Sequence, residues 1–238
     1  MLEILESLLL AFFAVAVLLP VVRYALRTLS PARNAAAITA EEAKYMQKQE
    51  LKLTVAYFFF ATVLSVFSAG VLAMVSSFIH ASKEHMFVLT PNFAALFAPG
   101  LLLGLTLAVI PLRLTQSTLM GHDYELYKTY VHRLEGQQSS KTYRILFLLM
   151  LVISGVVVWY AMRWHVAINE DSVEITNLLL EQRSYDMAEI QHIRYLGAEG
   201  EYLISFNDQT NLNTAYLKPV QLEMIALLAE KSGHRVIR

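Results

Sequence analysis

Four long apolar stretches alternate with polar segments along the first two thirds of the chain. Each stretch is long enough to cross a hydrocarbon core of roughly 30 Å as a helix. We therefore expect four membrane-spanning helices, over about residues 8–25, 54–79, 93–112 and 145–162. The first stretch lacks the basic start and the small-residue cleavage site of a signal peptide, so we expect it to be retained. Four spans place both chain ends on the same side of the membrane.

The polar segments that follow the first and third spans have helix-forming compositions. In the first of them, residues 28–53, Thr39 is followed three residues later by Glu42, which is the pattern of a capping box at the start of a helix. We expect this helix to continue without a break into the second span. The other segment, residues 113–142, is compatible with a helix as far as Gly136. Both loops are predicted to be helical extensions of the spans.

After Trp164 the hydrophobic period changes from helical to alternating. Short β-branched runs are separated by "EDS", "AEG" and "NDQ", which are typical of hairpin turns. An amphipathic helix follows from Lys218, with Pro219 in its first turn and Gly233 as its stop. The pattern predicts a small α+β module over residues 164–238, in which about five short antiparallel strands pack on this helix. The core-facing residues of the helix are predicted to be Leu222, Ile225 and Leu228.

The order of elements in this tail resembles the bacterial pleckstrin-homology-like modules that are attached to membrane helices. A membrane helix precedes a strand, "EDSVEI" leads into a second strand, and "LLLEQRSYDMAEIQHI", the hairpin "EYLISFNDQT" and a final helix follow. Arg183 and Tyr185 before "DMAEIQHI" are similar to the family's basic strand, turn and isoleucine-bearing strand. The resemblance covers about the last third of the chain. It implies a pleckstrin-homology-like module, residues 164–238, after a transmembrane region, residues 1–163, and a module in the cytoplasm.

The composition supports membrane integration and excludes cysteine chemistry. Hydrophobic residues make up 56% of the 238 residues, and the mean hydropathy is +0.45. Soluble domains usually contain roughly 45–50% apolar residues. Because the chain has no cysteine, it can form no disulfide, thiolate metal site or cysteine nucleophile.

Basic residues near the ends of the spans predict the orientation, because cytoplasmic loops carry an excess of lysine and arginine. Eleven such residues lie in the first and third loops and two on the opposite face. The eleven are Arg23, Arg27, Arg33, Lys44, Lys48, Lys52, Arg113, Lys128, Arg133, Lys141 and Arg144, and the two are Lys83 and Arg163. We therefore expect a multi-pass protein of the bacterial cytoplasmic (inner) membrane, with both termini and the module outside the cytoplasm, and follow this count over the placement that the resemblance implies.

The charge of the module limits its partners. From residue 163 to residue 238 it carries seven basic and eleven acidic residues, so it is a poor ligand for anionic headgroups. The basic first loop is interleaved with Glu41, Glu42 and Glu50, which indicates a solvated helix, and we expect no nucleic-acid binding.

Few residues are arranged for chemistry. His122, Asp123 and Glu125, with His132 beyond them, come nearest to a set of metal ligands, but their spacing is also that of an exposed polar loop, which we favour. His80 and His85 are expected in a short solvated loop. The sequence has no nucleophile-elbow or phosphate-binding glycine loop, so we expect no catalytic residue, no cofactor and no metal.

Small residues recur at every fourth position of the third span. Gly100, Gly104 and Ala108 form a smooth stripe that lets another helix approach closely. The approaching helix could belong to the same chain or to a partner, and the pattern favours neither.

We expect a non-catalytic scaffold or accessory subunit of a bacterial envelope complex. In this hypothesis the module docks a protein partner, either a membrane or envelope protein or another copy of the chain. The alternative is a component that interacts with membrane lipids or takes part in transport through the glycine-lined third helix.

Overall fold

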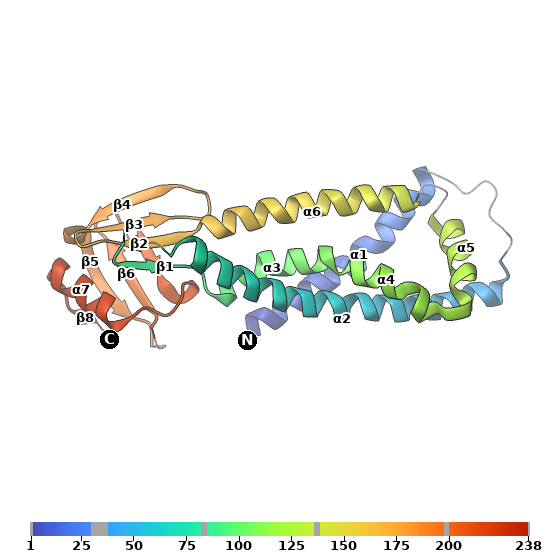
Figure 1. Cartoon of the computed structure of the whole chain (residues 1–238), viewed down its shortest axis with the longest axis horizontal. Coiled ribbons are helices and arrows are strands. Elements are labelled where there is room, and N and C mark those ends of the chain that lie inside the picture. The colour runs from blue at the N-terminus through green and yellow to red at the C-terminus, as the bar shows by residue number, and fades with distance from the viewer. Residues whose placement is uncertain (1, 30–37, 82–84, 136–138, 198–199, 238) are drawn as a thin grey trace. The chain divides into compact units, whose positions relative to one another are not determined.

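The computed structural model describes residues 2–29, 38–81, 85–135, 139–197 and 200–237 (Figure 1). These residues pack as two compact units. The first unit contains Met1–Ser68 and Gly100–Gly155, and the second contains Ala69–Pro99 and Val156–Arg238. Several residues used in the sequence arguments lie outside the described residues: Arg33, Lys83, Gly136, Arg238, and Ala198 and Glu199 of the "AEG" segment.

Six α-helices precede the β-rich tail in the described chain. They are α1 (Leu2–Leu29), α2 (Ala40–Ile79), α3 (Phe93–Leu107), α4 (Val109–Met120), α5 (Tyr124–Glu135) and α6 (Ser139–Arg163). Together they provide four helical segments that are long and apolar enough to cross a membrane: Ile4–Leu26, Ala40–Ile79, Phe93–Glu135 and Ser139–Arg163. The prediction of four apolar helices is confirmed.

Helix α2 is one continuous helix of 40 residues. It begins with the predicted capping box, because the backbone N–H of Glu42 donates to Thr39 Oγ1 at 3.2 Å and that of Thr39 donates to Glu42 Oε2 at 2.8 Å. Both groups would lack a partner at a free helix end, so the box stabilises this start. The polar first turns therefore continue into the apolar part without a break, as predicted.

The third apolar segment is interrupted where α3 ends at Leu107 and α4 begins at Val109. Pro111 lies in the first turn of α4 and has no backbone N–H to donate to Leu107. The helix beyond the break extends to Met120, and a short 3-10 turn, η1 (Gly121–Asp123), leads into α5. The predicted helical character of this loop is confirmed for its described residues.

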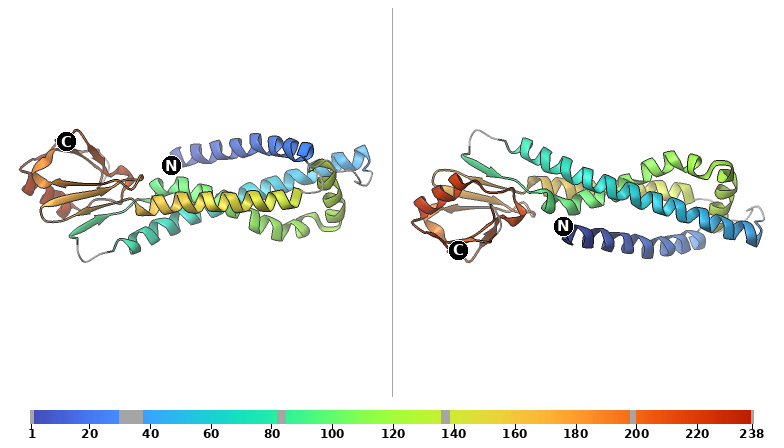
Figure 2. Two further views of the ribbon diagram at one scale, coloured as in Figure 1. Left: turned by 90° about the horizontal axis from the view of Figure 1, so that it is seen from above. Right: turned by 90° about the horizontal axis from the view of Figure 1, so that it is seen from below.

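The second unit contains two sheets of four strands each (Figure 2). In one, the order is β1-β2-β3-β4, and in the other it is β7-β6-β5-β8. The strands are β1 (Phe87–Leu89), β2 (His165–Ile168), β3 (Ser172–Thr176), β4 (Gln182–Asp186), β5 (Ile190–Tyr195), β6 (Tyr202–Phe206), β7 (Asn211–Asn213) and β8 (Val236–Ile237). All pairings are antiparallel except β5 with β8, which is parallel.

Strand β1 comes from the segment between α2 and α3, far from the tail in sequence. Its residues pair with β2, with Phe87 opposite Ile168 and Leu89 opposite Val166. Lys218 from the tail also donates to Ser77 on α2, and its backbone N–H donates to Thr90 O at 2.9 Å. The second unit therefore combines the tail with the segment that joins two apolar helices, an arrangement that the sequence analysis did not predict.

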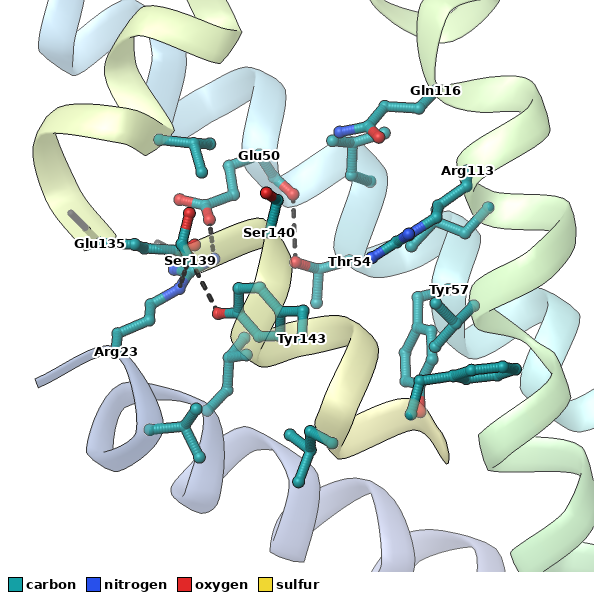
Figure 3. A pocket seen from close by; sticks show the side chains of 18 of the residues that line it. Arg23, Glu50, Thr54, Tyr57, Arg113, Gln116, Glu135, Ser139, Ser140 and Tyr143 are labelled. Atoms are coloured by element: carbon teal, nitrogen blue, oxygen red, sulfur yellow. Dashed lines mark hydrogen bonds and ion pairs between the residues drawn. The ribbon is translucent and has the colours of Figure 1, made fainter. Parts of the chain in front are cut away.

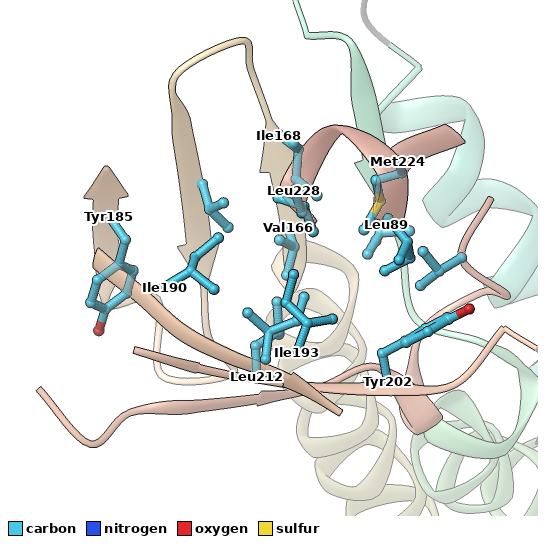
Figure 4. Packing of buried hydrophobic residues seen from close by; sticks show 14 of the residues in the cluster. Leu89, Val166, Ile168, Tyr185, Ile190, Ile193, Tyr202, Leu212, Met224 and Leu228 are labelled. Carbon is cyan, nitrogen blue, oxygen red and sulfur yellow. The ribbon is translucent and has the colours of Figure 1, made fainter. Parts of the chain in front are cut away.

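Side chains from both sheets and from α7 (Leu222–Ser232) meet in one apolar core (Figure 4). Of the three predicted core residues of α7, Ile225 and Leu228 are 5% and 0% exposed, whereas Leu222 is 77% exposed. The prediction for Leu222 is wrong because three residues turn an α-helix by about 300°, which is about 60° short of a full turn. Leu222, two such steps before Leu228, therefore points about 120° away from it. Met224, which is fully buried, completes the stripe.

The ends of α7 agree partly with the sequence. Gly233 follows its last residue with φ +70°, the left-handed conformation that glycine adopts most easily, so the predicted stop is confirmed. Pro219 precedes the helix instead of lying in its first turn, because α7 begins only at Leu222.

Candidate functional site

The predicted small-residue stripe lies at a close approach of α2 and α3 within the first unit. Gly100, Gly104 and Ala108 are all buried. A Cβ added at Gly104 would meet the side chain and the backbone of Ser65, whose Cα would be 2.6 Å away. Gly104 therefore contacts a helix of its own chain, which favours intramolecular packing over a partner helix at this position.

A pocket of about 890 Å³ opens within the first unit, lined by residues of α1, α2, α3, α4, α5 and α6 (Figure 3). One part of its wall is apolar and includes Leu19, Leu53, Phe58, Val109 and Phe147. The other part of the wall is polar and includes Arg23, Glu50, Arg113, Glu135 and Tyr143. This volume is within the range of about 300–1,000 Å³ that is usual for ligand sites.

Four of the polar side chains form one hydrogen-bonded cluster (Figure 3). Arg23 of α1 pairs with Glu50 of α2 and donates from Nε to Glu135 Oε1 of α5 at 3.1 Å. Tyr143 of α6 donates from its hydroxyl to the same Glu135 oxygen at 3.0 Å. Glu135 is 3% exposed, and the cluster satisfies only one of its two oxygens, because Oε2 has no partner among the described residues.

The remaining cations of the pocket stand apart from this cluster. Arg113 points from α4 into the pocket (Figure 3), and Arg144 of α6 and Lys128 of α5 also line it. Lys128 pairs with Glu125 at 2.7 Å, whereas Arg113 and Arg144 form no ion pair with any described residue. With Arg23 counted, four basic and two acidic side chains line the pocket, an excess of two positive charges.

This combination of surfaces suits an amphiphile with a negatively charged head. Guanidinium groups bind phosphate oxygens through directed, charge-assisted hydrogen bonds. The apolar wall can accept hydrocarbon chains.

The polar residues of the third loop do not converge on a common point. Asp123 accepts a hydrogen bond from the hydroxyl of Tyr45 at 2.7 Å, and Glu125 pairs with Lys128. His122 is exposed, and His132 lines the pocket. Among the described residues, no three histidine, aspartate or glutamate side chains are placed to hold a metal ion.

Two histidines that were expected in a solvated loop are half-buried in the second unit, so that expectation is wrong. The ring of His80 lies 4.3 Å from the ring of His165, and His85 Nδ1 lies 2.8 Å from Asn169 Oδ1. The cause is β1, which brings its connecting segment against β2. Burial lowers the pKa of His165, and the nearby His80 and His85 act in the same direction.

The sequence analysis missed the cluster of Arg23, Glu50, Glu135 and Tyr143. Its members come from four helices, and 27 and 112 residues separate Arg23 from its two carboxylates. No short motif can encode such separations. The available signal was Arg23, which lies inside the first apolar stretch, since charged residues in membrane helices usually pair.

Comparison with known proteins gives no relative from which a function could be transferred. The chain matches no family model, no curated protein and no solved structure.

Proposed function

We propose that the chain is an integral, multi-pass membrane protein that binds an anionic phospholipid in the pocket of its first unit, without catalysing a reaction. One observation carries this proposal: Arg113 and Arg144 line the pocket beside its apolar wall and have no carboxylate partner among the described residues. The four apolar helices support membrane insertion. Among the sequence-based hypotheses, the geometry therefore favours lipid interaction, although through this pocket and not through the glycine stripe.

The physical argument concerns where each part of a lipid finds its best partner. Arg113 and Arg144 directly flank the apolar segments 93–112 and 145–162, at the depth where headgroups meet acyl chains in a membrane-inserted chain. A phosphate bound there would pair with guanidinium groups that otherwise remain unpaired. Its acyl chains would follow the apolar helix faces beside Leu19 and Phe147, which already contact lipid in a membrane-inserted chain.

Native mass spectrometry can test the proposal. The full chain is reconstituted in phosphatidylcholine nanodiscs that contain phosphatidylglycerol, then released and weighed. We expect retained phosphatidylglycerol, and we expect the double variant Arg113→Gln/Arg144→Gln to bind it about tenfold more weakly or worse, because hydrogen bonds to charged groups contribute about 1.5–3 kcal/mol each.

A matched control is Lys44→Gln/Lys48→Gln on α2, which removes the same charge from exposed residues that do not line the pocket. Equal loss in both double variants would indicate general electrostatic attraction to the bilayer surface and would contradict a specific site. Retention of phosphatidylglycerol by the arginine variant would contradict the proposal as well.

The pleckstrin-homology-like character of the tail remains part of the proposal. The tail contains the predicted antiparallel strands and final helix α7, but β1 comes from outside it and β8 pairs in parallel, so the likeness stays a prediction. The docked protein partner stays a prediction, and purification in mild detergent tests it: a stoichiometric second protein would favour the scaffold hypothesis over lipid binding.

A further inference from the structure

The turn between β3 and β4 exposes two leucines. Leu178 and Leu179 are 49% and 75% exposed, and neither belongs to the core of the second unit. The side chain of Asn177 holds the turn, because its Oδ1 accepts from the backbone N–H groups of Leu179 at 2.9 Å and Glu181 at 3.0 Å. Apolar residues at such a tip serve neither the turn nor the core, since turns favour glycine, asparagine and other polar residues.

The backbone of this turn is also unfavourable for leucine. Leu180 has φ +62°, a left-handed conformation that costs a residue with a Cβ roughly 1–2 kcal/mol. Glycine or asparagine would adopt it more easily. The exposure of Leu178 and Leu179 is therefore explained neither by the local geometry nor by packing against the described core of the second unit.

Strand register places the turn beside the end of a candidate membrane span. Helix α6 ends at Arg163, and β2 begins two residues later with His165. His165 pairs with Thr176, the last residue of β3, so the chain beyond Thr176 continues back toward the last turn of α6 (Figure 1). At about 3.3 Å per residue, Leu178 and Leu179 can reach the level of Arg163 or beyond it.

The last turns of α6 have the features of a membrane interface. Trp159 and Tyr160 are 57% and 42% exposed, and the guanidinium of Arg163 lies 4.6 Å from the centre of the Trp159 ring. Tryptophan and tyrosine gather where headgroups meet the hydrocarbon core. The leucine turn therefore lies near the level at which this belt marks the bilayer surface.

We infer that Leu178 and Leu179 insert into the interfacial region of the same bilayer that α6 crosses, and so anchor the first sheet to the membrane surface. The inference rests on the membrane insertion proposed above and is independent of the lipid pocket. The contact is apolar, because the tail carries more acidic than basic residues and gains little from anionic headgroups.

The absence of cysteine from the chain allows single probes to be placed without background. Three single variants, Leu179→Cys, Glu170→Cys and Val152→Cys, are labelled with a fluorophore and reconstituted in phosphatidylcholine vesicles that contain lipids with a nitroxide at a shallow acyl position, and for residue 152, which lies near the middle of its span, at a deep one. Glu170 lies in the turn at the opposite end of β2, and Val152 is a 64% exposed residue of α6. We expect strong quenching at residues 179 and 152 and little quenching at residue 170.

The three probes separate the possible failures. Quenching at residue 152 without quenching at residue 179 would overturn the leucine anchor while membrane insertion stands. No quenching at residue 152 would contradict insertion itself, and the anchor with it. Adding Leu178→Asp to the Leu179→Cys protein should abolish the quenching at residue 179. The thermal unfolding midpoint should not change, because both side chains are exposed. Unchanged quenching would overturn the anchor.

Discussion

The Cα of Ser65 on α2 lies 2.6 Å from the point where a Cβ on Gly104 of α3 would stand. Carbon atoms of different residues in non-bonded contact do not come so close, so the two helices can pack at this distance only because residue 104 is glycine. The Ser65 hydroxyl donates to Ala61 O of its own helix at 2.6 Å, and its oxygen is also among the atoms that the added Cβ would meet. A larger residue at position 104 must therefore move a helix backbone.

We predict that Gly104→Ala destabilises the first unit by about 1–3 kcal/mol, the usual cost of overpacking. Ser65→Ala should not restore stability, because the added methyl group also meets the backbone of Ser65. The thermal unfolding midpoint in one mild detergent measures the effect.

The matched control is Gly155→Ala in α6, where a new Cβ would meet no atom within 4 Å. In a helix this change should be neutral or stabilising by up to about 1 kcal/mol, since alanine has the higher helix propensity. Equal midpoints for both variants would show that α2 and α3 are not in close contact.

A second prediction concerns the core of the second unit. Ile225→Asp places a charge among the buried residues around Met224 and Leu228, at a cost of several kcal/mol against a stability of about 5 kcal/mol for a small domain. We expect the tail to unfold and to become cleavable by trypsin beyond Arg163, while the helical fragment remains intact.

Leu222→Asp on the same helix is the control, because Leu222 is 77% exposed. It should leave the tail resistant to trypsin. If the Ile225 variant were equally resistant, α7 would not close the core.

The sequence predicted the elements that local patterns encode. The capping box of Thr39 and Glu42, the stop at Gly233 and the apolar length of each span depend on neighbouring residues, and the structure contains all of them. Strand β1 was missed because three residues, "FVL", give too short a pattern and their partner β2 lies far along the chain.

The candidate site was less predictable than the fold. The stripe at Gly100, Gly104 and Ala108 could be read from its spacing, but spacing does not identify the helix it contacts. The pocket depends on Arg23, Glu135 and their neighbours meeting across helices. Such contacts follow from tertiary packing, and one sequence alone contains no periodic signal for them.

The second unit should lose stability in mild acid through His165. Burial lowers the pKa of this ring below its ordinary value of 6.5; the hydrogen bond to Arg163 O and the nearby Glu174 oppose this shift, and His80 and His85 add to it by repulsion. The folded state therefore binds a proton less readily than the unfolded state. The stabilisation is complete above about pH 6.5 and is lost as the pH falls through the folded pKa.

Thermal unfolding midpoints measured between about pH 5 and 8 check this prediction. His165→Asn should flatten the acid side of the profile, because asparagine does not titrate there and can still donate to Arg163 O, which lies 2.9 Å from His165 Nδ1. His122→Asn, which changes an exposed ring in the first unit, should leave the profile unchanged. An unaltered profile in the His165 variant would assign the acid sensitivity elsewhere.

The last prediction concerns orientation in the membrane. The excess of basic residues on the first and third loops predicts that these loops are cytoplasmic and that the tail is outside. A reporter that is active only outside the cytoplasm should be active after Arg238 and silent when inserted near Gln137. In intact cells, an impermeant maleimide should label the Glu170→Cys protein, while the Lys48→Cys protein should react only after the membrane is opened. The reverse pattern in both assays would place the tail in the cytoplasm and the pocket near the outer surface, because Arg113 and Arg144 flank the same ends of the helices as Lys48.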